Sequence, residues 1–263
     1  MASTLIDGPG LARASDNRLL ANLPRCELDK LIPWLESVEL PAGFVVFHPH
    51  VKIEHVYFPT SGSISMVMLA PDGAVEVASV GTEGYLGVSA LLYGDSMPTR
   101  AFVQSAGHAF RIEVEAFRAV VNDSAVIQQL FSRYALSLLN QIAQAVACNR
   151  LHSLESRCAR WLLVAHDRVD GDRILLTQES LSYMMGVHRP AVTVAARELQ
   201  KAGFIGYGRG VITIMDRPGL ESSACTCYQA MRADFDKLVG ALPPAGIAVP
   251  DARHSAPGSR PTP

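Results

Sequence analysis

The sequence predicts an α+β fold whose parts follow one another along the chain. Short apolar runs separated by turn residues fill residues 40–112, a helical pattern covers residues 115–169, and two short amphipathic segments precede a small hairpin within residues 177–215. Short strands at this spacing are typical of a β-sandwich or barrel. The 263 residues, 49% of them hydrophobic and 18% charged, suffice for two modest domains.

The β-rich block is built from apolar runs that alternate with punctuation by proline, glycine and aspartate. Asp72-Gly73, between MVMLA and VEVASV, predicts a tight hairpin. A helical segment with regularly spaced leucines, residues 17–37, is expected to precede this block.

The first half of the long helical pattern carries an apolar stripe at heptad spacing. Its members are Ile127, Phe131, Tyr134, Leu138, Gln141 and Ala145. Such a stripe predicts a helix pair across a two-fold axis, in which Gln141 fixes the register. A second face with Leu139 and Val146 would then pack on the chain's own β domain. The alternative is that the stripe itself packs on that domain.

The segment from Thr177 to Ile205 predicts two helices joined by a tight turn. Thr177 is placed to cap the first helix, Gly186 to end it, and Pro190 to begin the second. The second helix buries one face and leaves small residues and arginine on the other. Residues 173–211 hold five Lys or Arg and two acidic residues, a basic island in a chain of formal charge −2. These features favour insertion of the second helix into the DNA major groove.

Residues 177–215 resemble the winged helix-turn-helix of the Crp/Fnr family of bacterial transcription regulators. The likeness rests on the glycine turn, the second helix, the exit A-G-F-I and the wing R-G-x-I-x-I, and it extends over residues 40–228. It implies a cyclic-nucleotide-binding-like β-roll (a double-stranded β-helix or jelly roll), a long dimerisation helix and a winged helix-turn-helix. We place these domains at 16–118, 119–150 and 151–228, with a disordered tail at 241–263.

The resemblance implies a homodimer on palindromic double-stranded DNA, in the cytoplasm, with RNA polymerase as a further partner. The residues expected to contact DNA are Thr177, Arg189, Pro190, Ala191, Thr193, Val194, Arg197 and Arg209. Family members often carry Glu where this chain has Pro190 and Arg where it has Val194. We therefore expect a target sequence that differs from the common one.

The sensor domain departs from the cyclic-nucleotide-binding members of the family. Those members carry Gly-Glu-Leu-Gly and Arg-Ser-Ala or Arg-Thr-Ala segments, whereas this chain has Tyr85 at the Glu position and Thr99-Arg100-Ala101. The candidate effector residues are Glu83, Gly84, Tyr85, Leu86, Gly87, Thr99 and Arg100. The departures disfavour a cyclic nucleotide, and we expect the loop either to persist as part of the β-roll structure or to bind another, unidentified small molecule.

No metal or iron–sulfur cofactor is expected from the cysteines. Only Cys26 precedes residue 148, and one thiolate cannot hold a cluster. Cys148 and Cys158 are expected to be small buried hydrophobes. The two thiols of Cys225-Thr226-Cys227 fall short of the four ligands usual for structural zinc.

A metal-dependent enzyme of the cupin type is the alternative hypothesis. His48 and His50 share one face of a predicted strand, and Glu54 follows them. The spacing from Gly43 to His48 is one residue short of the cupin pattern, and no second cupin motif follows. We therefore predict a regulator rather than an enzyme, with no membrane-spanning segment.

Overall fold

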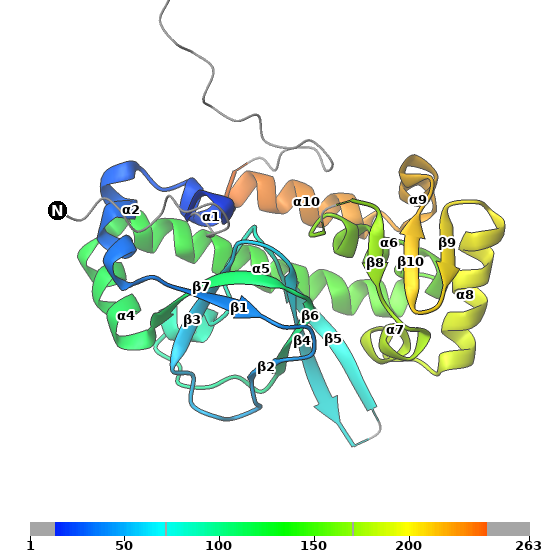
Figure 1. The fold of residues 1–263 in the computed structure, drawn as a ribbon, viewed down its shortest axis with the longest axis horizontal. Coiled ribbons are helices and arrows are strands. Elements are labelled where there is room, and N and C mark those ends of the chain that lie inside the picture. Colours follow the sequence, from blue (N-terminus) through cyan, green and yellow to red (C-terminus); the bar gives the residue numbers. More distant parts are fainter. Residues whose placement is uncertain (1–13, 72, 170, 241–263) are drawn as a thin grey trace, which may run out of the picture.

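The structure, a computed structural model, describes residues 14–71, 73–169 and 171–240. A β domain lies beside one half of a long helix, and a group of helices with a small sheet lies at its other end (Figure 1). The predicted α+β fold is confirmed. The tail predicted to be disordered, 241–263, lies outside the described residues.

The β domain consists of two antiparallel sheets. One has the strand order β1-β7-β3 and the other β2-β6-β4-β5. In the second sheet Ala70 pairs with Gly73, so β4 and β5 form the hairpin predicted at Asp72-Gly73, although Asp72 itself is not described. The strands are β1 Glu36–Leu40, β2 Val45–Phe47, β3 His55–Pro59, β4 Ser63–Ala70, β5 Gly73–Val80, β6 Arg100–Ser105 and β7 Gly107–Glu113.

Short helices precede, interrupt and follow the strands. The segment predicted to be helical at 17–37 is divided, because Pro24 lacks the N–H needed to continue a helix and instead caps α2. Its last residues belong to strand β1. The short helices are η1 Ala14–Asp16, α1 Arg18–Ala21, α2 Arg25–Leu31, η2 Ile32–Trp34, α3 Val88–Leu91 and α4 Val114–Asp123.

A long helix, α5 Ala125–Leu151, follows after a break at Ser124. The Ser124 hydroxyl accepts a hydrogen bond from the Ile127 N–H at 3.2 Å, which caps α5 and separates it from α4. The helix therefore begins at Ala125 and not at the predicted position 119. Its 27 residues span about 40 Å, and it runs through much of the molecule in Figure 1.

The predicted dimer stripe of α5 faces the inside of its own chain. Ile127, Phe131, Tyr134, Leu138 and Ala145 are buried, and Gln141 is half-buried. Aromatic rings hold the stripe in place, with Phe131 and Tyr134 5.2 and 5.0 Å from the ring of Tyr85, centroid to centroid. The prediction that this stripe forms the dimer interface is wrong, because the β domain and the C-terminal helix cover it.

The opposite face of α5 exposes large hydrophobic side chains. Leu136, Leu139 and Val146 are 47%, 56% and 67% exposed. With the exposed Ala143 they follow one another at intervals of three, four and three residues, which is the heptad spacing of a coiled-coil seam. The second face, which we expected to pack on the β domain, is therefore exposed and lacks a partner within residues 14–71, 73–169 and 171–240.

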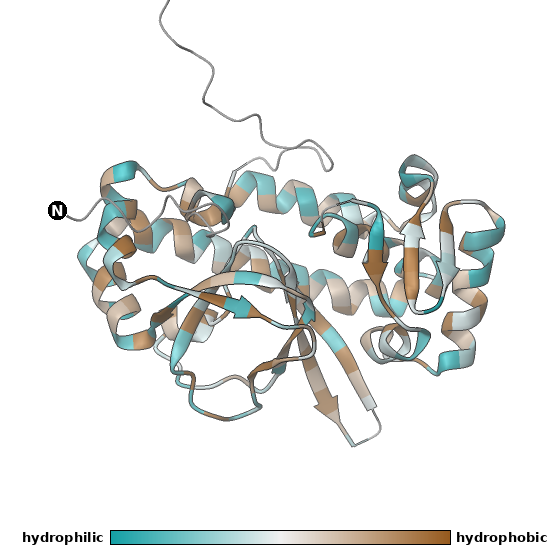
Figure 2. Cartoon of the chain, in the orientation of Figure 1, coloured by the Kyte–Doolittle hydropathy of each residue, from teal (hydrophilic) through white to brown (hydrophobic). Residues whose placement is uncertain are grey.

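The C-terminal part combines helices with a sheet of order β8-β10-β9, which is brown over much of β10 in Figure 2. Strand β8 was not predicted, and it adds an edge to the expected hairpin. Helix α10 packs along α5 (Figure 1). The elements are α6 Leu154–His166, β8 Arg173–Leu175, α7 Gln178–Met185, α8 Arg189–Lys201, β9 Ile205–Gly208, β10 Val211–Ile214, α9 Arg217–Ser223 and α10 Cys227–Leu238.

The β4–β5 hairpin connects the β domain to the C-terminal part. Val67 of β4 belongs to the hydrophobic core of the C-terminal helices. The carboxylate of Glu76 on β5 accepts a hydrogen bond from the Trp161 indole at 2.8 Å and another from the Ser65 hydroxyl at 2.5 Å. Burial raises the pKa of Glu76 despite these two bonds. The two parts of the chain thus share both apolar and polar contacts.

Among the described residues, no helix combines the length and apolar character required to cross a membrane.

Candidate nucleic-acid interface and sensor pocket

Helix α7 begins and ends where the sequence predicts. The Thr177 hydroxyl caps it by accepting a hydrogen bond from the Ser180 N–H at 3.0 Å. Gly186 ends it in the left-handed conformation, at φ 64° and ψ 38°, which glycine adopts without strain. The turn that follows is short, and α8 begins at Arg189 with Pro190 in its first turn. Helix α8 packs directly against α7.

Helix α8 has a buried face and a free face. Val192, Ala195, Ala196 and Leu199 are buried against α6 and α7. The free face exposes residues predicted to contact DNA, namely Arg189, Pro190, Ala191, Val194 and Arg197. Within the described part of the chain, the guanidinium groups of Arg189 and Arg197 form no side-chain hydrogen bond or ion pair. Both charges are therefore available to an anionic partner.

Thr193 is less available than the other residues of this face. Its hydroxyl lies 2.8 Å from Gln178 Oε1 and 3.0 Å from the Arg189 carbonyl oxygen, and both are acceptors. Its single proton is engaged within the protein, so a ligand can use only the oxygen lone pairs. The bond to Gln178 ties α8 to the first turn of α7, which gives Thr193 a positioning role.

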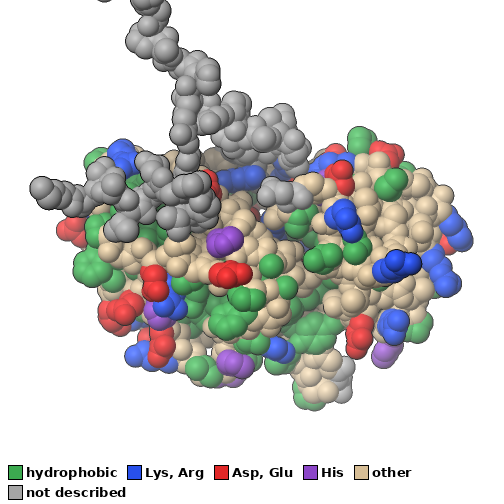
Figure 3. Space-filling view, in the orientation of Figure 1, with side chains coloured by type: hydrophobic (Ala, Val, Ile, Leu, Met, Phe, Trp, Pro, Cys, Tyr) green, Lys and Arg blue, Asp and Glu red, His purple; other side chains and the backbone are tan. Residues whose placement is uncertain are grey.

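The wing brings a third arginine to the same side. Arg209 lies between β9 and β10 at φ 51°, exposed, and between two glycines. Together with Thr177 and Arg189 it borders an open hollow of about 500 Å³ between the wing and the helices. Lys and Arg side chains gather at this end of the molecule in Figure 3. The first helix cap, α8 and the wing thus present one basic surface.

The sensor loop uses Tyr85 as a core residue. Tyr85 is fully buried among the rings of Phe58, Phe117, Phe131 and Tyr134. Gly84 is required beside it, because any Cβ at that position would collide with the Tyr134 ring. The loop is also fixed by Asn17, whose amide donates to the carbonyl oxygens of Pro59 and Gly84 at 2.8 Å each. At Tyr85 and Gly84, therefore, the loop packs the core and leaves no room for a ligand.

Glu83 points from the same loop to the end of α6. One carboxylate oxygen lies 2.5 Å from Arg168 Nη2, and the side chains are only 15% and 8% exposed. The same guanidinium donates to the Ser79 hydroxyl and carbonyl oxygens at 2.5 and 2.9 Å. Burial alone would raise the pKa of Glu83, but the charge and hydrogen bonds of Arg168 outweigh burial and lower it. This ion pair joins the sensor loop directly to the C-terminal part.

Thr99 and Arg100, the other candidate effector residues, have surroundings of their own. Arg100 lies at the start of β6, with its guanidinium 5.7 Å from the ring centroid of Phe102. Arg100 Nε and Thr99 Oγ1 are buried without a hydrogen-bond partner in the described residues. Leu86 pairs with Tyr57 through a β-bridge, and Gly87 caps α3. The structure thus gives separate roles to residues that we expected to form one ligand site.

A second cavity, separate from the hollow beside the wing, lies between α5, α6 and α10. Its volume is about 500 Å³, and Glu83 and Arg168 line it together with Tyr134. Asp167 and Arg232 add further charge to its wall. A cavity of this size with a few polar groups suits a small ligand.

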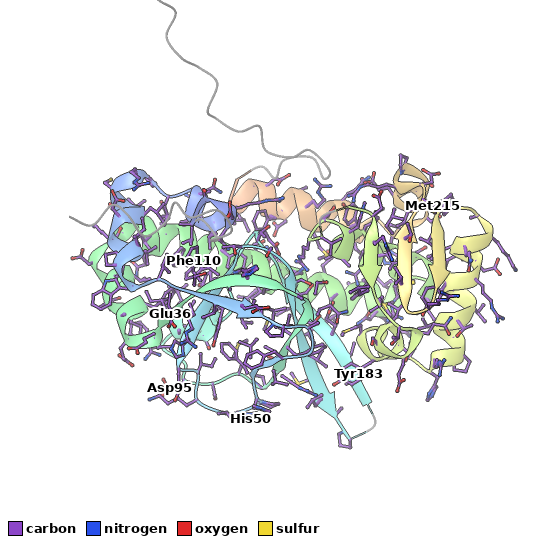
Figure 4. All side chains as sticks on the ribbon, in the orientation of Figure 1. Glu36, His50, Asp95, Phe110, Tyr183 and Met215 are labelled. Carbon is purple, nitrogen blue, oxygen red and sulfur yellow. The ribbon has the colours of Figure 1, made fainter. Side chains whose placement is uncertain are left out.

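His48, His50 and Glu54 form no metal centre. All three are exposed, and Figure 4 places His50 at the rim of the β domain. Among the described residues, one set of three or more potential metal ligands converges, and it contains none of the three. The cupin-type enzyme hypothesis is not supported.

The converging set is Cys148, His152, Cys225 and Cys227. Cys148 is buried, as expected. Cys225 and Cys227 were expected to lack nearby partners, and this expectation is wrong, because Cys148 and His152 lie beside them. The sequence contains a hint that we did not use: Cys148 and His152 are four residues apart on a helical pattern, so they share a face. Cys158 lies outside the set, and burial raises its pKa to about 12, as expected for an unreactive thiol.

Two family models match the chain. The model described as a Crp-like helix-turn-helix domain matches residues 156–223, and the model described as a cyclic nucleotide-binding domain matches residues 37–124. No curated protein matches the sequence.

Solved structures share the fold at low sequence identity. A putative Crp/Fnr-family regulator from Eubacterium rectale is 17% identical, with a TM-score of 0.63 over 80% of this chain and 98% of that one. FixK2 from Bradyrhizobium japonicum is 15% identical, with a TM-score of 0.62 over 73% and 98%. CLP from Xanthomonas campestris, described as a c-di-GMP-responsive global regulator, is 14% identical, with a TM-score of 0.59 over 73% and 99%.

Proposed function

Because this chain belongs to the Crp/Fnr family of DNA-binding transcription regulators, we propose that it acts as a homodimer on palindromic double-stranded DNA, under the control of a signal at its sensor domain. The observation that carries the proposal is the free face of α8, on which Arg189 and Arg197 are exposed and unpaired within the described chain. A helix with such a face fits the major groove, where arginine binds guanine edges.

The exposed face of α5 supports the dimer. Leu136, Leu139, Ala143 and Val146 follow a heptad seam and are exposed, with no partner among the described residues. Two copies of α5 packed along this seam would bury these side chains around a two-fold axis. The dimer would then present two α8 helices to successive major grooves, about 34–36 Å apart.

Within each half-site, Arg189 and Arg197 are proposed to contact bases. Pro190, Ala191 and Val194 would add apolar contacts, for instance with a thymine methyl group. Thr177 and Arg209, at the helix cap and the wing, are proposed to bind phosphate. Thr193 remains a predicted DNA contact, in which its hydroxyl oxygen would act only as a hydrogen-bond acceptor. A role on DNA also predicts a cytoplasmic protein with RNA polymerase as a further partner.

The proposed signal acts through the cavity between α5, α6 and α10. Glu83 and Arg168 line this cavity and join the sensor loop to α6. A ligand that competes for either charge would weaken this connection and let the C-terminal part move relative to α5. Tyr85 fills the place of the carboxylate that would bind a ribose hydroxyl, which disfavours a cyclic nucleotide.

The test of DNA binding begins with selection of bound sequences from random double-stranded DNA. On the selected site, Arg189→Ala and Arg197→Ala should each weaken binding by about 1–3 kcal/mol and relax the preference at one base position. Arg25→Ala, an exposed arginine of α2, is the matched control and should bind as the unmodified protein does. Equal affinity of the Arg189→Ala/Arg197→Ala variant and the unmodified protein would refute the assignment of α8.

The effector part is tested separately by repeating the selection and the affinity measurement with candidate small molecules. A ligand of the cavity should change DNA affinity in the unmodified protein and lose that effect in Glu83→Gln. If no candidate changes the affinity, a regulator controlled by its own abundance becomes the better hypothesis.

A further inference from the structure

Three cysteines and one histidine meet where the long helix ends. Cys148 lies in the last turn of α5 and His152 directly follows that helix. Cys225 and Cys227 lie between α9 and the start of α10. The four ligand atoms are all within 4.8 Å of one another, although the two pairs are more than 70 residues apart in the sequence.

The separations are those of ligands around a single ion. The sulfurs of Cys148 and Cys225 are 3.4 Å apart, and Cys227 Sγ is 3.4 Å from His152 Nδ1. Around a tetrahedral zinc ion with Zn–S of about 2.3 Å and Zn–N of about 2.0–2.1 Å, neighbouring ligand atoms lie about 3.5–3.8 Å apart. A disulfide would instead require about 2.05 Å, and all the described cysteines are free. The ligands of a two-iron cluster would be spread further apart by the cluster itself.

The surroundings suit a charged metal–thiolate group. Cys148, Cys225 and Cys227 are buried and form a cluster of their own, separate from both hydrophobic cores. The Gln144 amide donates a hydrogen bond to Cys227 Sγ at 3.0 Å. Arg157 is buried nearby, and its Nε has no hydrogen-bond partner among the described residues. Three thiolates and one Zn²⁺ carry a net charge of −1, which this guanidinium offsets.

We propose that Cys148, His152, Cys225 and Cys227 bind one zinc ion, which fixes the end of α5 to the connection between α9 and α10. Three cysteines and a histidine are a usual ligand set for closed, structural zinc. On binding, each thiol loses its proton to solvent and donates a lone pair to the metal, and no electron is transferred. The site spans the joint between α5 and α6, so it holds the C-terminal part at a set angle. Its existence does not depend on DNA binding.

The experiment uses the full chain. Zinc is measured by mass spectrometry of the purified protein. The metal is then removed with a chelator, and the metal-free protein is titrated with Co²⁺, whose absorption spectrum depends on its ligands. We expect about one zinc per chain, and Co²⁺ should give sulfur-to-metal charge-transfer bands and the intense visible bands of tetrahedral coordination. Cys225→Ser and His152→Ala should each lower the zinc affinity at least about tenfold. Cys26→Ser changes an exposed cysteine outside the cluster and should bind zinc as the unmodified protein does.

Three results would overturn the proposal. One is a zinc-supplemented unmodified protein that holds far less than one equivalent and gives no charge-transfer band with Co²⁺. Another is a Cys148–Cys225 disulfide in protein purified under reducing conditions. The third is an unchanged zinc affinity in both ligand variants. The Co²⁺ spectrum needs no variant, so misfolding of Cys225→Ser does not remove the test.

Discussion

The ion pair between Glu83 and Arg168 joins the sensor loop to the end of α6, and its two charges can be removed singly or together. Arg168→Met leaves the Glu83 carboxylate buried without its partner, and Glu83→Gln leaves the guanidinium in the same condition. The loss of one partner from a buried pair costs about 3–5 kcal/mol, because the remaining charge stays out of water. Each single variant should lose this much free energy of unfolding.

The double variant separates the pair from the rest of its surroundings. With both charges gone, no uncompensated charge remains, so the loss should be smaller than the sum of the single losses by about 2–3 kcal/mol. Urea unfolding can be followed by the fluorescence of Trp161, which is 5% exposed and donates to Glu76 across the same joint. The other tryptophan, Trp34, is 56% exposed, and Trp34→Phe removes its contribution.

The pH dependence gives a second measurement on the same variants. The pKa of Glu83 is lowered in the folded protein, since the charge and hydrogen bonds of Arg168 outweigh burial. Its contribution to stability is therefore present above the ordinary carboxyl pKa of 4.5 and is lost as the pH falls through the lowered value. Glu83→Gln should remove this part of the acid sensitivity. Single losses that simply add, with an unchanged acid profile, would refute the reasoning.

Three further outcomes are expected. Leu139→Glu should convert the dimer to a monomer in analytical ultracentrifugation, because it places a charge in the proposed seam of α5, whereas Leu92→Glu changes an exposed leucine elsewhere and should leave the dimer intact; an unaltered dimer would contradict the seam. Burial raises the pKa of Glu76, so its contribution to stability is lost as the pH rises through that pKa; Glu76→Gln should raise the melting temperature at pH 8 more than at pH 5, and the same shift at both would count against a buried carboxylate. Gly84→Ala should cost about 1–3 kcal/mol in urea unfolding, since its methyl group meets a ring of α5. Gly208→Ala, with open space at its Cβ, is the matched control, and equal stability of the two would show that the loop yields.

The elements that the sequence predicts well are those with local chemical causes. Thr177 and Gly186 fix the ends of α7 through a side-chain hydrogen bond and a left-handed residue, and both act within one helical turn. The β4–β5 hairpin likewise lies where the sequence carries a local turn signal, Asp72-Gly73. Strand β8 was missed because three residues, Arg173–Leu175, carry too little pattern, and their pairing with β10 is a tertiary contact.

The sequence could not predict which surface packs against each apolar face of α5. Both Phe131 and Leu139 lie on apolar stripes, and periodicity shows that a stripe is apolar without showing which surface covers it. The aromatic cluster around Tyr85 determines which face of α5 packs on the β domain, because the Phe131 ring packs against Tyr85 in that cluster. The zinc ligands were missed for a similar reason. Cys148 and Cys225 belong to segments that only the packing of α10 along α5 brings together.

An ion pair, a hydrogen bond and a proposed metal site connect the sensor domain to the DNA-binding part. The Glu83–Arg168 pair and the Glu76–Trp161 hydrogen bond join β5 and its following loop to α6 and the residues just after it. The proposed zinc site joins α5 to the start of α10. The first two are largely buried, and Trp161 lies in α6 while Arg168 lies two residues after its end. A displacement of that helix would therefore break both together and favour two distinct positions over a gradual series. The zinc ligands lie at the end of α5, where they would act as the pivot. A ligand in the cavity beside Arg168 would therefore change the angle of α8 and not the integrity of either part.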